Sequence, residues 1–474
     1  MLIGRKEEQA RLREAYASQY SEFVAVYGRR RVGKTFLVRE TFDYRFAFEH
    51  AGLAHADMKS QLQSWRSSLI DCGLRDCPLP TNWLDAFDQL KSLIRGLDTP
   101  KKVIFIDEMP WMDTHRSGFV TALEHFWNGW ASGRKDVLLI ICGSATSWII
   151  NKVIRNHGGL HNRVSMKINV KPFTLHECMS YAQSQHLAFS HELVLQAYMI
   201  FGGIPYYWKC LDRHKSLAQN IDALIYHSDG ELYNEFDQLY ASLFRHPEQY
   251  LAVIAALGTI RAGMTRDEII KHAHMADNGN LTHVLNDLES CGFIRRYCAY
   301  SMKNKHAVYQ LIDFYTIFYY KMVAGLDRQD KDRWLDLQQT PAFNTWCELA
   351  FERVCMAHVP QLKAALGIAG VSTSIYAWSS RHTEHTDGRG CQIDLVIERR
   401  DQTIDLCEMK YSKGDIHITA DDYRSVLNKQ ETFRRETRTK SALHNVLVAS
   451  SAVARNAYSD EFQHIITLDQ LFKD

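Results

Sequence analysis

The feature that most constrains the fold is the segment Gly28–Thr35, which fits the pattern G-x-x-x-x-G-K-[ST] without a gap. It follows an apolar run at 23–27 and precedes a helix predicted over 36–40. In that setting the glycines let backbone N–H groups surround phosphates, Lys34 reaches the β and γ oxygens, and the Thr35 hydroxyl binds Mg²⁺. A glycine-rich turn without a nucleotide is the alternative. The predicted nucleotide contacts are Gly28, Arg29, Arg30, Arg31, Val32, Gly33, Lys34, Thr35 and Phe36.

A second motif agrees with the first. The apolar strand predicted at 103–106 ends in Asp107 and Glu108. Phosphoryl transfer needs a carboxylate that holds Mg²⁺ through water, here Asp107, and one that polarises the attacking water, here Glu108. The next predicted strand, 137–142, runs into Ser144, which could lie between that water and the γ-phosphate. A plain turn at Ser144 is the alternative.

The segment after this strand is basic, because no acidic residue occurs from Val137 to His176. An arginine here could reach a γ-phosphate within the chain or across a subunit interface, as an arginine finger does. We favour Arg163 over Arg155 for that role. The cations of the segment are Lys152, Arg155, Arg163, Lys167 and Lys171.

The first part of the chain alternates short apolar runs with amphipathic stretches, which predicts a mostly parallel α/β sheet in a domain at 1–173. The strands are expected at 23–27, 45–49, 103–106, 137–142 and 165–170. The pattern then turns helical over 174–248, and the stretch 314–337 reads as a helical connector. A further α/β unit is predicted at 338–474.

Between these helical segments, residues 249–313 predict a winged helix-turn-helix. A helix at 251–257 precedes a second one that begins at Thr265, where Glu268 stands at capping-box spacing. A third helix is predicted at 280–291, followed by β-type runs at 293–300 and 307–312 around a polar turn at 301–305.

Charged residues in the last α/β unit suggest a second site. Two strands, 392–397 and 404–410, flank a turn near Asp401, which sets Asp394 opposite Glu408 and puts Lys410 on the same face. Two carboxylates and a lysine suit a metal-dependent phosphodiesterase, with Asp394 and Glu408 on Mg²⁺ and Lys410 orienting or deprotonating water. A solvated hairpin face with an incidental salt bridge is the alternative. A following basic segment could bind phosphates or be a solvated helix: Arg424, Lys429, Arg434, Arg435, Arg438 and Lys440.

Several motifs together resemble the predicted archaeal and bacterial ATPases of the AAA+ superclass, close to the STAND branch. They are Ile3-Gly4-Arg5-Lys6-Glu7-Glu8, the phosphate loop, Ile-Asp-Glu-Met-Pro-Trp, Cys-Gly-Ser-Ala-Thr-Ser-Trp and Phe-Gly-Gly-Ile-Pro-Tyr-Tyr. The resemblance covers nearly the whole chain and implies a P-loop core, a helical lid and a winged helix. It also implies that Gly203 and Pro205 lie near the adenine.

The C-terminal part resembles the PD-(D/E)xK core of restriction-endonuclease-fold nucleases. Glu352, on a helix predicted at 346–358, matches the helical acidic position of that core and joins Asp394 and Glu408 as an implied metal ligand. Gln-Ile-Asp stands where the family has Pro-Asp. An active nuclease and a nuclease-like fold that has lost activity both remain open.

The residues of the predicted recognition helix in the winged helix argue both for and against DNA binding. It and its lead-in carry Asn278, Asn280, Thr282, His283 and Asn286, but also Asp287 and Glu289, and neither Lys nor Arg. Base reading uses Arg, Lys, Asn or Gln, with cations on the phosphates. The hairpin supplies Arg295, Arg296, Lys303 and Lys305. DNA binding and a role as a structural spacer are both left open.

Composition sets the remaining limits. The chain has 56 Lys and Arg against 55 Asp and Glu, a formal net charge of +1, so an anionic partner must be held by local patches. The N-terminus is charged within five residues, which argues against a signal peptide with a continuous apolar centre. No apolar run approaches the ~20 residues of a membrane helix. The 11 cysteines lack a CxxC pair, which favours buried free thiols.

We therefore expect a cytoplasmic ATPase that binds ATP and Mg²⁺, with a second Mg²⁺ or Mn²⁺ at the nuclease-like site. The expected partner is nucleic acid, DNA favoured, with no membrane partner; a second copy of the chain is a further candidate. The alternative function is a non-cleaving, ATP-gated regulator or DNA-binding protein with an inactive nuclease-like scaffold.

Overall fold

The chain forms two compact units, Met1–Pro172 and Phe173–Asp474. The computed structural model describes residues 2–144, 146–155, 158–244, 246–298, 300, 307–326, 333–380 and 391–473. The first boundary falls next to the predicted one at 173. The further division at 248, 313 and 337 stays a prediction.

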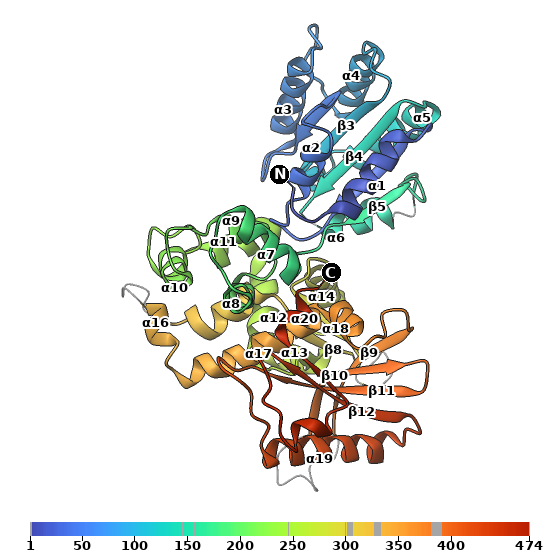
Figure 1. Cartoon of the computed structure of the whole chain (residues 1–474). Helices are drawn as coiled ribbons and strands as arrows, with labels where there is room; N and C mark the ends of the chain where they lie inside the picture. The colour runs from blue at the N-terminus through green and yellow to red at the C-terminus, as the bar shows by residue number, and fades with distance from the viewer. Residues whose placement is uncertain are drawn as a thin grey trace. The chain divides into compact units, whose positions relative to one another are not determined.

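The first unit is built on a parallel sheet of five strands in the order β2-β3-β4-β1-β5 (Figure 1). This confirms the predicted strand-helix alternation. β2 begins later than predicted, because Asp43 and Tyr44 adopt left-handed backbone angles in a turn that ends the preceding helix. The strands are β1 (Glu22–Tyr27), β2 (Phe48–Ala51), β3 (Lys102–Asp107), β4 (Val137–Gly143) and β5 (Met166–Asn169).

Helices cover both faces of this sheet, as apolar side chains on both sides of the buried strands require. On one face, Phe23, Ile104 and Leu139 join a core with α3 (Met58–Asp71), α4 (Trp83–Arg95) and α5 (Phe119–Gly129). α1 (Lys6–Ala17) and α2 (Lys34–Thr41) pack on the other face. Because all five strands are parallel, their carboxyl ends share one edge, and the predicted phosphate chemistry lies there.

The second unit opens with a helical segment and continues with the elements predicted for a winged helix. The segment contains α7 (Leu175–Ser184), α8 (His191–Phe201), α9 (Pro205–Lys209), α10 (Leu217–Ile221) and α11 (Glu235–Leu243). The predicted capping box is present, since Thr265 and Glu268 bond each other's backbone N–H. The next elements are α12 (Pro247–Thr259), β6 (Met264–Thr265), α13 (Arg266–His272), α14 (Gly279–Ser290), β7 (Ile294–Tyr297) and β8 (Val308–Leu311).

The predicted hairpin is confirmed as the antiparallel pair β7 and β8, while its turn at 301–305, with Lys303 and Lys305, lies outside the described residues. The predicted connector contains α15 (Phe314–Phe318), a π-helical turn (Tyr319–Val323) and α16 (Arg333–Leu337). None of the helices in the described part of the chain combines the length and apolar character needed to cross a membrane.

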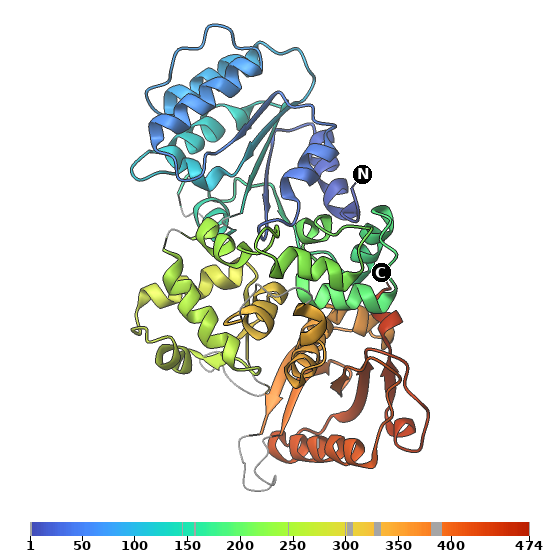
Figure 2. The same ribbon diagram turned by 90° about the vertical axis from the view of Figure 1, so that its left-hand side faces the viewer.

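A mixed sheet, separate from the first, forms the C-terminal part, in the order β13-β12-β11-β10-β9. β9, β10 and β11 are antiparallel, and β12 and β13 run parallel to β11. Figure 2 shows the long helix α19 beside these strands. The elements are α17 (Pro341–Ala357), α18 (Val359–Ala365), β9 (Thr373–Ser379), β10 (Gln392–Arg399), β11 (Thr403–Lys410), α19 (Ala420–Thr437), β12 (Ala442–Ala449), β13 (His464–Ile466) and α20 (Leu468–Leu471).

A β-bulge in β10 decides which way Asp394 points. The register with β9 shifts between Ile393 and Val396, yet both side chains pack in the same core with Phe433 of α19. Strict alternation would place residues three apart on opposite faces. The bulge therefore turns the intervening Asp394 and Leu395 away from the α19 side of the sheet.

His358 anchors the end of α17 to the start of α7. Its Nδ1 donates to the Val354 carbonyl at 2.8 Å, and its Nε2 accepts from the Leu175 N–H at 2.9 Å. The side chain is 1% exposed, and burial lowers its pKa to about 4. Protonation of Nε2 would break the bond to Leu175, so the folded chain holds this imidazole neutral.

We predict that His358 makes the second unit sensitive to acid. The unfolded chain takes up this proton near pH 6.5 and the folded chain only near pH 4, so stability falls as the pH drops through that window. The loss reaches about 3 kcal/mol at pH 4. Calorimetry across pH 4–7 should show this part of the pH dependence missing from His358→Gln. The exposed His283→Gln should keep the wild-type profile, and equal profiles for all three proteins would contradict the assignment.

Candidate functional site

Backbone geometry forces the shape of the loop between β1 and α2. Gly28 has φ +142°, and a Cβ there would lie 2.3 Å from the Val170 carbonyl oxygen. Gly33, directly before α2, has φ +87° in the left-handed region. Only glycine fits both positions without strain. The loop therefore delivers the unpaired N–H groups at the start of α2 toward the sheet edge, where they can bind phosphate.

Lys34 is buried inside this loop. Its Nζ donates to the carbonyls of Gly28 at 3.0 Å and Arg29 at 2.8 Å, and lies 3.4 Å from the Ser144 hydroxyl. These partners are all neutral. The ammonium thus keeps its full charge for the phosphate oxygens that a loop of this shape encloses.

The structure brings together Thr35 and Asp107, the two residues predicted to bind Mg²⁺ in the ATP site. The Thr35 hydroxyl donates to Asp107 Oδ2 at 2.6 Å, while Asp107 Oδ1 accepts the Glu108 N–H at 2.8 Å. A hydroxyl beside a carboxylate is a hard-oxygen donor set that fits Mg²⁺, which takes few ligands from protein and more from water and nucleotide phosphates. The two residues come from α2 and β3, so the close parallel packing of the sheet creates the pair.

Glu108 is held in a strained backbone conformation, with φ 45° and ψ 38°. Ser144 fixes its carboxylate twice, because the Ser144 hydroxyl donates to Oε1 at 2.7 Å and the Ser144 N–H to Oε2 at 3.2 Å. Strain of this kind persists where the surroundings determine it, and it clusters at functional sites. The structure thus brings Ser144 to Glu108 and to Lys34 at once.

The other predicted loop residues divide by exposure. Arg29 and Val32 are buried, Arg30 and Arg31 are half-buried, and Phe36 is 43% exposed on the first turn of α2. Their contacts with a nucleotide stay a prediction.

Arg5 is a site residue whose role sequence reasoning missed. Its guanidinium donates to the Lys171 carbonyl at 2.6 Å and the Val32 carbonyl at 3.4 Å, and lies 3.5 Å from Glu8. The side chain is buried. Arg5 therefore ties the phosphate loop to the segment after β5. In the sequence, Arg5 stood out only as a member of the N-terminal motif Ile3-Gly4-Arg5-Lys6-Glu7-Glu8, which contributes to the family resemblance.

The structure corrects the expectation of an in-chain arginine finger at Arg163. Arg163 precedes β5, whose first paired residue, Met166, lies beside Val24 in the parallel sheet. The phosphate loop follows the other end of β1. Arg163 is exposed at the opposite edge of the sheet, so within its own unit it does not reach the loop. A contact across a subunit interface stays a prediction.

Gly203 and Pro205 belong to the second unit, so their predicted place near the adenine stays a prediction. The structure gives Gly203 a packing reason of its own: a Cβ there would lie 1.9 Å from the Phe173 carbonyl oxygen. Pro205 is the first residue of α9.

The four residues of the predicted nuclease-like site fall into two groups. Glu352 and Asp394 both meet the guanidinium of Arg261, with Glu352 Oε2 2.9 Å from Arg261 Nε and Asp394 Oδ2 3.7 Å from Nη2. Glu408 and Lys410 instead pair with α19, at 2.6 Å to Lys429 and 2.5 Å to Asp422 respectively.

The register supports part of the hairpin prediction. Leu395 pairs with Cys407, and continuing this antiparallel register by one residue places Asp394 opposite Glu408. The turn centres on Asp401 as expected. Across the bulge at Ile393–Val396, however, the Asp394 side chain accepts from Gln392 and lies near Arg261, which also contacts Glu352. In the part of the chain that the structure describes, no three His, Cys, Asp or Glu side chains form a group that could hold a metal ion.

The predicted free thiols are present where the sequence placed them. Cys142, Cys355 and Cys407 are buried and free, and burial raises the pKa of each thiol. They are packing residues without ready nucleophilic character.

Comparison with known proteins identifies the first part of the chain. Residues 2–211 match the model of an ATPase domain found predominantly in Archaea. This part of the chain is similar to the ATPase domains of that family. The protein is therefore a P-loop ATP hydrolase, and ATP and Mg²⁺ binding follow from that assignment.

Three relatives give the extent of the likeness. The uncharacterized protein MJECL04 of Methanocaldococcus jannaschii is 24% identical over 444 residues, which cover 91% of this chain and 92% of that one. The Walker-type ATPase PABY2304 of Pyrococcus abyssi is 15% identical with a TM-score of 0.50, over 68% of this chain and 96% of that chain, and shows the fold alone. A STAND protein with a tetratricopeptide repeat sensor from Pyrococcus horikoshii is 18% identical with a TM-score of 0.33, over 77% and 48%.

We predict that Glu108→Gln separates ATP binding from hydrolysis in this ATPase. Loss of a general base lowers turnover by about 10²–10⁴-fold, while Lys34 and the loop still hold the nucleotide. Single-turnover phosphate release and fluorescent-nucleotide binding would measure the two steps. Glu49→Gln, which alters a carboxylate on β2 paired with Arg39, should hydrolyse ATP normally. A Glu108→Gln protein with wild-type turnover would remove Glu108 from this role.

Ser144→Ala should lower turnover by less. It removes one hydrogen bond to the Glu108 carboxylate and leaves the backbone N–H bond in place, so a loss of about 10- to 100-fold in kcat is expected from the worth of a bond to a charged group. Nucleotide affinity should stay within about threefold, since Lys34 keeps its two carbonyl partners. Steady-state kinetics checks both values. Ser147→Ala is the matched control, and an equal loss there would contradict a specific role for Ser144.

Proposed function

We propose that ATP turnover at the first unit controls a metal-dependent, nuclease-like domain in the second unit that acts on nucleic acid. The observation that carries the ATP half is the chain of contacts from Thr35 through Asp107 and Glu108 to Ser144 and Lys34. It joins the ends of β1, β3 and β4 into one set of phosphate, Mg²⁺ and water ligands.

The residues divide the chemistry of hydrolysis among them. Lys34 and the loop N–H groups bind and orient the phosphates, and Thr35 with Asp107 would hold Mg²⁺, which supplies charge neutralisation on the β and γ oxygens when bound. Glu108 accepts the proton of the attacking water. Ser144 fixes the direction of the Glu108 carboxylate, so that its oxygens need no reorganisation at the moment of reaction.

Support for a nuclease-like second unit comes from Glu352 and Asp394. Two carboxylates from α17 and β10 converge on one cation, which is the arrangement that a divalent metal uses with one or two protein carboxylates and substrate phosphates. Lys410 lies on the neighbouring strand β11. The donor set is of hard oxygens and fits Mg²⁺ or Mn²⁺.

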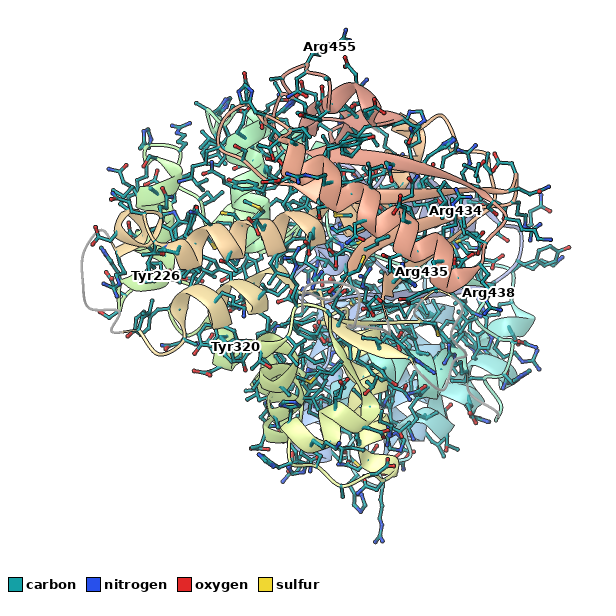
Figure 3. All side chains as sticks on the ribbon, turned by 90° about the horizontal axis from the view of Figure 1, so that it is seen from below. Tyr226, Tyr320, Arg434, Arg435, Arg438 and Arg455 are labelled. Atoms are coloured by element: carbon teal, nitrogen blue, oxygen red, sulfur yellow. The ribbon has the colours of Figure 1, made fainter. Side chains whose placement is uncertain are left out.

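Support for a nucleic-acid substrate comes from one end of α19. Arg434, Arg435 and Arg438 are exposed there, while Arg455 is exposed elsewhere on the second unit (Figure 3). Across the described residues, the side chains of these three form no ion pair, whereas Arg424 and Lys429 earlier in the helix pair with Asp421 and Glu408. Cations without local counter-charges are available to phosphates.

The winged helix contributes less to that surface than its sequence suggests. Asn278 is used as the N-cap of α14, and Asn280 donates to Gln249 at 2.6 Å. Asp287 accepts from the Tyr250 hydroxyl, and Arg295 donates to Gln310 at 2.7 Å. These internal contacts favour the role of a packing element over that of a base reader.

A second candidate is a non-cleaving, ATP-gated regulator. The ion pairs of Glu352 and Asp394 with Arg261, and of Glu408 and Lys410 with α19, favour it, because each charged group of the nuclease-like site already has a partner within the chain. Such a protein would keep the fold as a scaffold and transmit the nucleotide state through binding alone.

Cleavage assays separate the two candidates. Wild-type protein with Mg²⁺ or Mn²⁺ and ATP should cut at least one of single-stranded DNA, duplex DNA and RNA, and Asp394→Asn should lower the rate by at least about 100-fold by removing a metal ligand. Asp401→Asn, at the tip of the same hairpin, should cut normally. Absence of metal-dependent cleavage by the wild type, or equal cleavage by Asp394→Asn, would leave the regulator.

A further inference from the structure

Arg261 contacts both carboxylates, Glu352 and Asp394, that the proposed nuclease-like site would offer to a metal ion. It lies in the short connection between α12 and β6, within the predicted winged helix. Its Nε is 2.9 Å from Glu352 Oε2, and Nη2 contacts Glu352 Oε1, so the guanidinium grips Glu352 at two points. Nη2 also lies 3.7 Å from Asp394 Oδ2.

Burial makes this contact obligatory for Glu352. The Glu352 side chain is 3% exposed and that of Asp394 22%, whereas the Arg261 side chain that contacts them is 47% exposed. A carboxylate as buried as Glu352 needs a counter-charge at close range. Its next cation, Arg353 Nη1, is 3.9 Å away. Removal of Arg261 therefore leaves a site that attracts another cation.

The backbone around Arg261 is built to hold it there. Its carbonyl accepts from Arg353 at 2.7 Å and from Gln310 at 2.8 Å. The neighbouring Ala262 carbonyl accepts from the Tyr297 hydroxyl at 2.6 Å. At Gly263, φ is +86° and a Cβ would lie 2.4 Å from the Tyr309 carbonyl oxygen. These contacts fix the connection to β7, β8 and α17, so the direction of Arg261 is set by the fold.

The local charge balance also opposes a metal ion while Arg261 is present. Arg353 lies 3.9 Å from Glu352, and both Arg353 and Arg295 interact electrostatically with Asp394. Burial together with the neighbouring Arg353 lowers the pKa of Arg295 to about 10. Three guanidinium groups thus face two carboxylates. A divalent cation added to this group without displacing one of them would meet net repulsion.

We propose that Arg261 and a divalent metal ion compete for Glu352 and Asp394, so that the connection before β6 closes the nuclease-like site until Arg261 withdraws. The inference rests on the proposed function of that site. It assigns Arg261 as a positioning residue that keeps the site closed, a role which neither the family match nor the motifs suggest. The two states exclude each other, since both cations need the same carboxylate oxygens.

Mn²⁺ titration of the full chain without nucleotide tests the competition, with free Mn²⁺ read by electron paramagnetic resonance. Arg261→Gln should bind Mn²⁺ at least tenfold more tightly than the wild type, and Asp394→Asn added to it should remove the gain. Arg266→Gln is the matched control, because Arg266 belongs to the same module and pairs with Asp277 instead. Equal Mn²⁺ affinity for Arg261→Gln and wild type would overturn the proposal.

Two further measurements keep the test decisive. If Arg261→Gln does not fold, Arg261→Lys replaces it, because lysine keeps the charge but cannot contact Glu352 at two points. Arg261→Lys should show a smaller gain in Mn²⁺ affinity, and a wild-type Mn²⁺ affinity for this variant would count against the proposal. Cleavage assays on the same proteins separate it from the proposed function. A gain in Mn²⁺ affinity without cleavage of any nucleic acid supports the competition and contradicts the proposed nuclease function. Metal-dependent cleavage with unchanged Mn²⁺ affinity supports the nuclease function and contradicts the competition.

Discussion

The hydrogen bond from the Thr35 hydroxyl to Asp107 is the interaction on which the ATP site depends. It joins the first turn of α2 to the end of β3 at 2.6 Å, across β4 in the order of the sheet. The bond forms because β1, β3 and β4 run parallel and end at one edge. At the same edge Gly28 approaches Val170 so closely that a Cβ would not fit. The packing of the buried apolar strands thus fixes the positions of the strand ends, and these positions bring the polar residues of the ATP site together.

Much of this arrangement could be predicted from the sequence, because the phosphate loop, the Asp107–Glu108 pair and Ser144 are local features at strand ends. The capping box at Thr265 and the hairpin turn at Asp401 were predictable for the same reason. Arg163 does not reach the phosphate loop within its own unit, because it precedes a strand that runs parallel to β1 and so lies at the opposite edge of the sheet. The prediction rested on the basic character of the segment and did not consider which end of the strand Arg163 occupies. The prediction that Asp394 and Glu408 share one face of the hairpin relied on the regular alternation of side chains along an unbroken strand. A β-bulge interrupts this alternation and cannot be recognised from the residue pattern.

Base reading by the winged helix, which the sequence left open beside a structural role, gains no support from the structure for a related reason. Asn278, Asn280 and Arg295 have the side chains that read DNA, but the same groups cap helices and bond neighbouring amides. The sequence supplies the polar group, and only the fold decides whether a backbone N–H or a neighbouring Gln forms a hydrogen bond with it. In this chain the neighbours are Gln249 and Gln310, each within 3 Å.

The two sites hold their resident cations in different ways, and this difference bears on control. Lys34 is satisfied by neutral carbonyls, so phosphate can take it over without leaving a charge behind. Arg261 is satisfied by the buried carboxylate of Glu352, which cannot be left alone. Under the proposed competition, exchange at the second site is concerted, with a metal arriving as the guanidinium leaves. Under that proposal the site stays closed to metal unless a competing anion draws Arg261 away, and a phosphodiester backbone carries such an anion at every nucleotide.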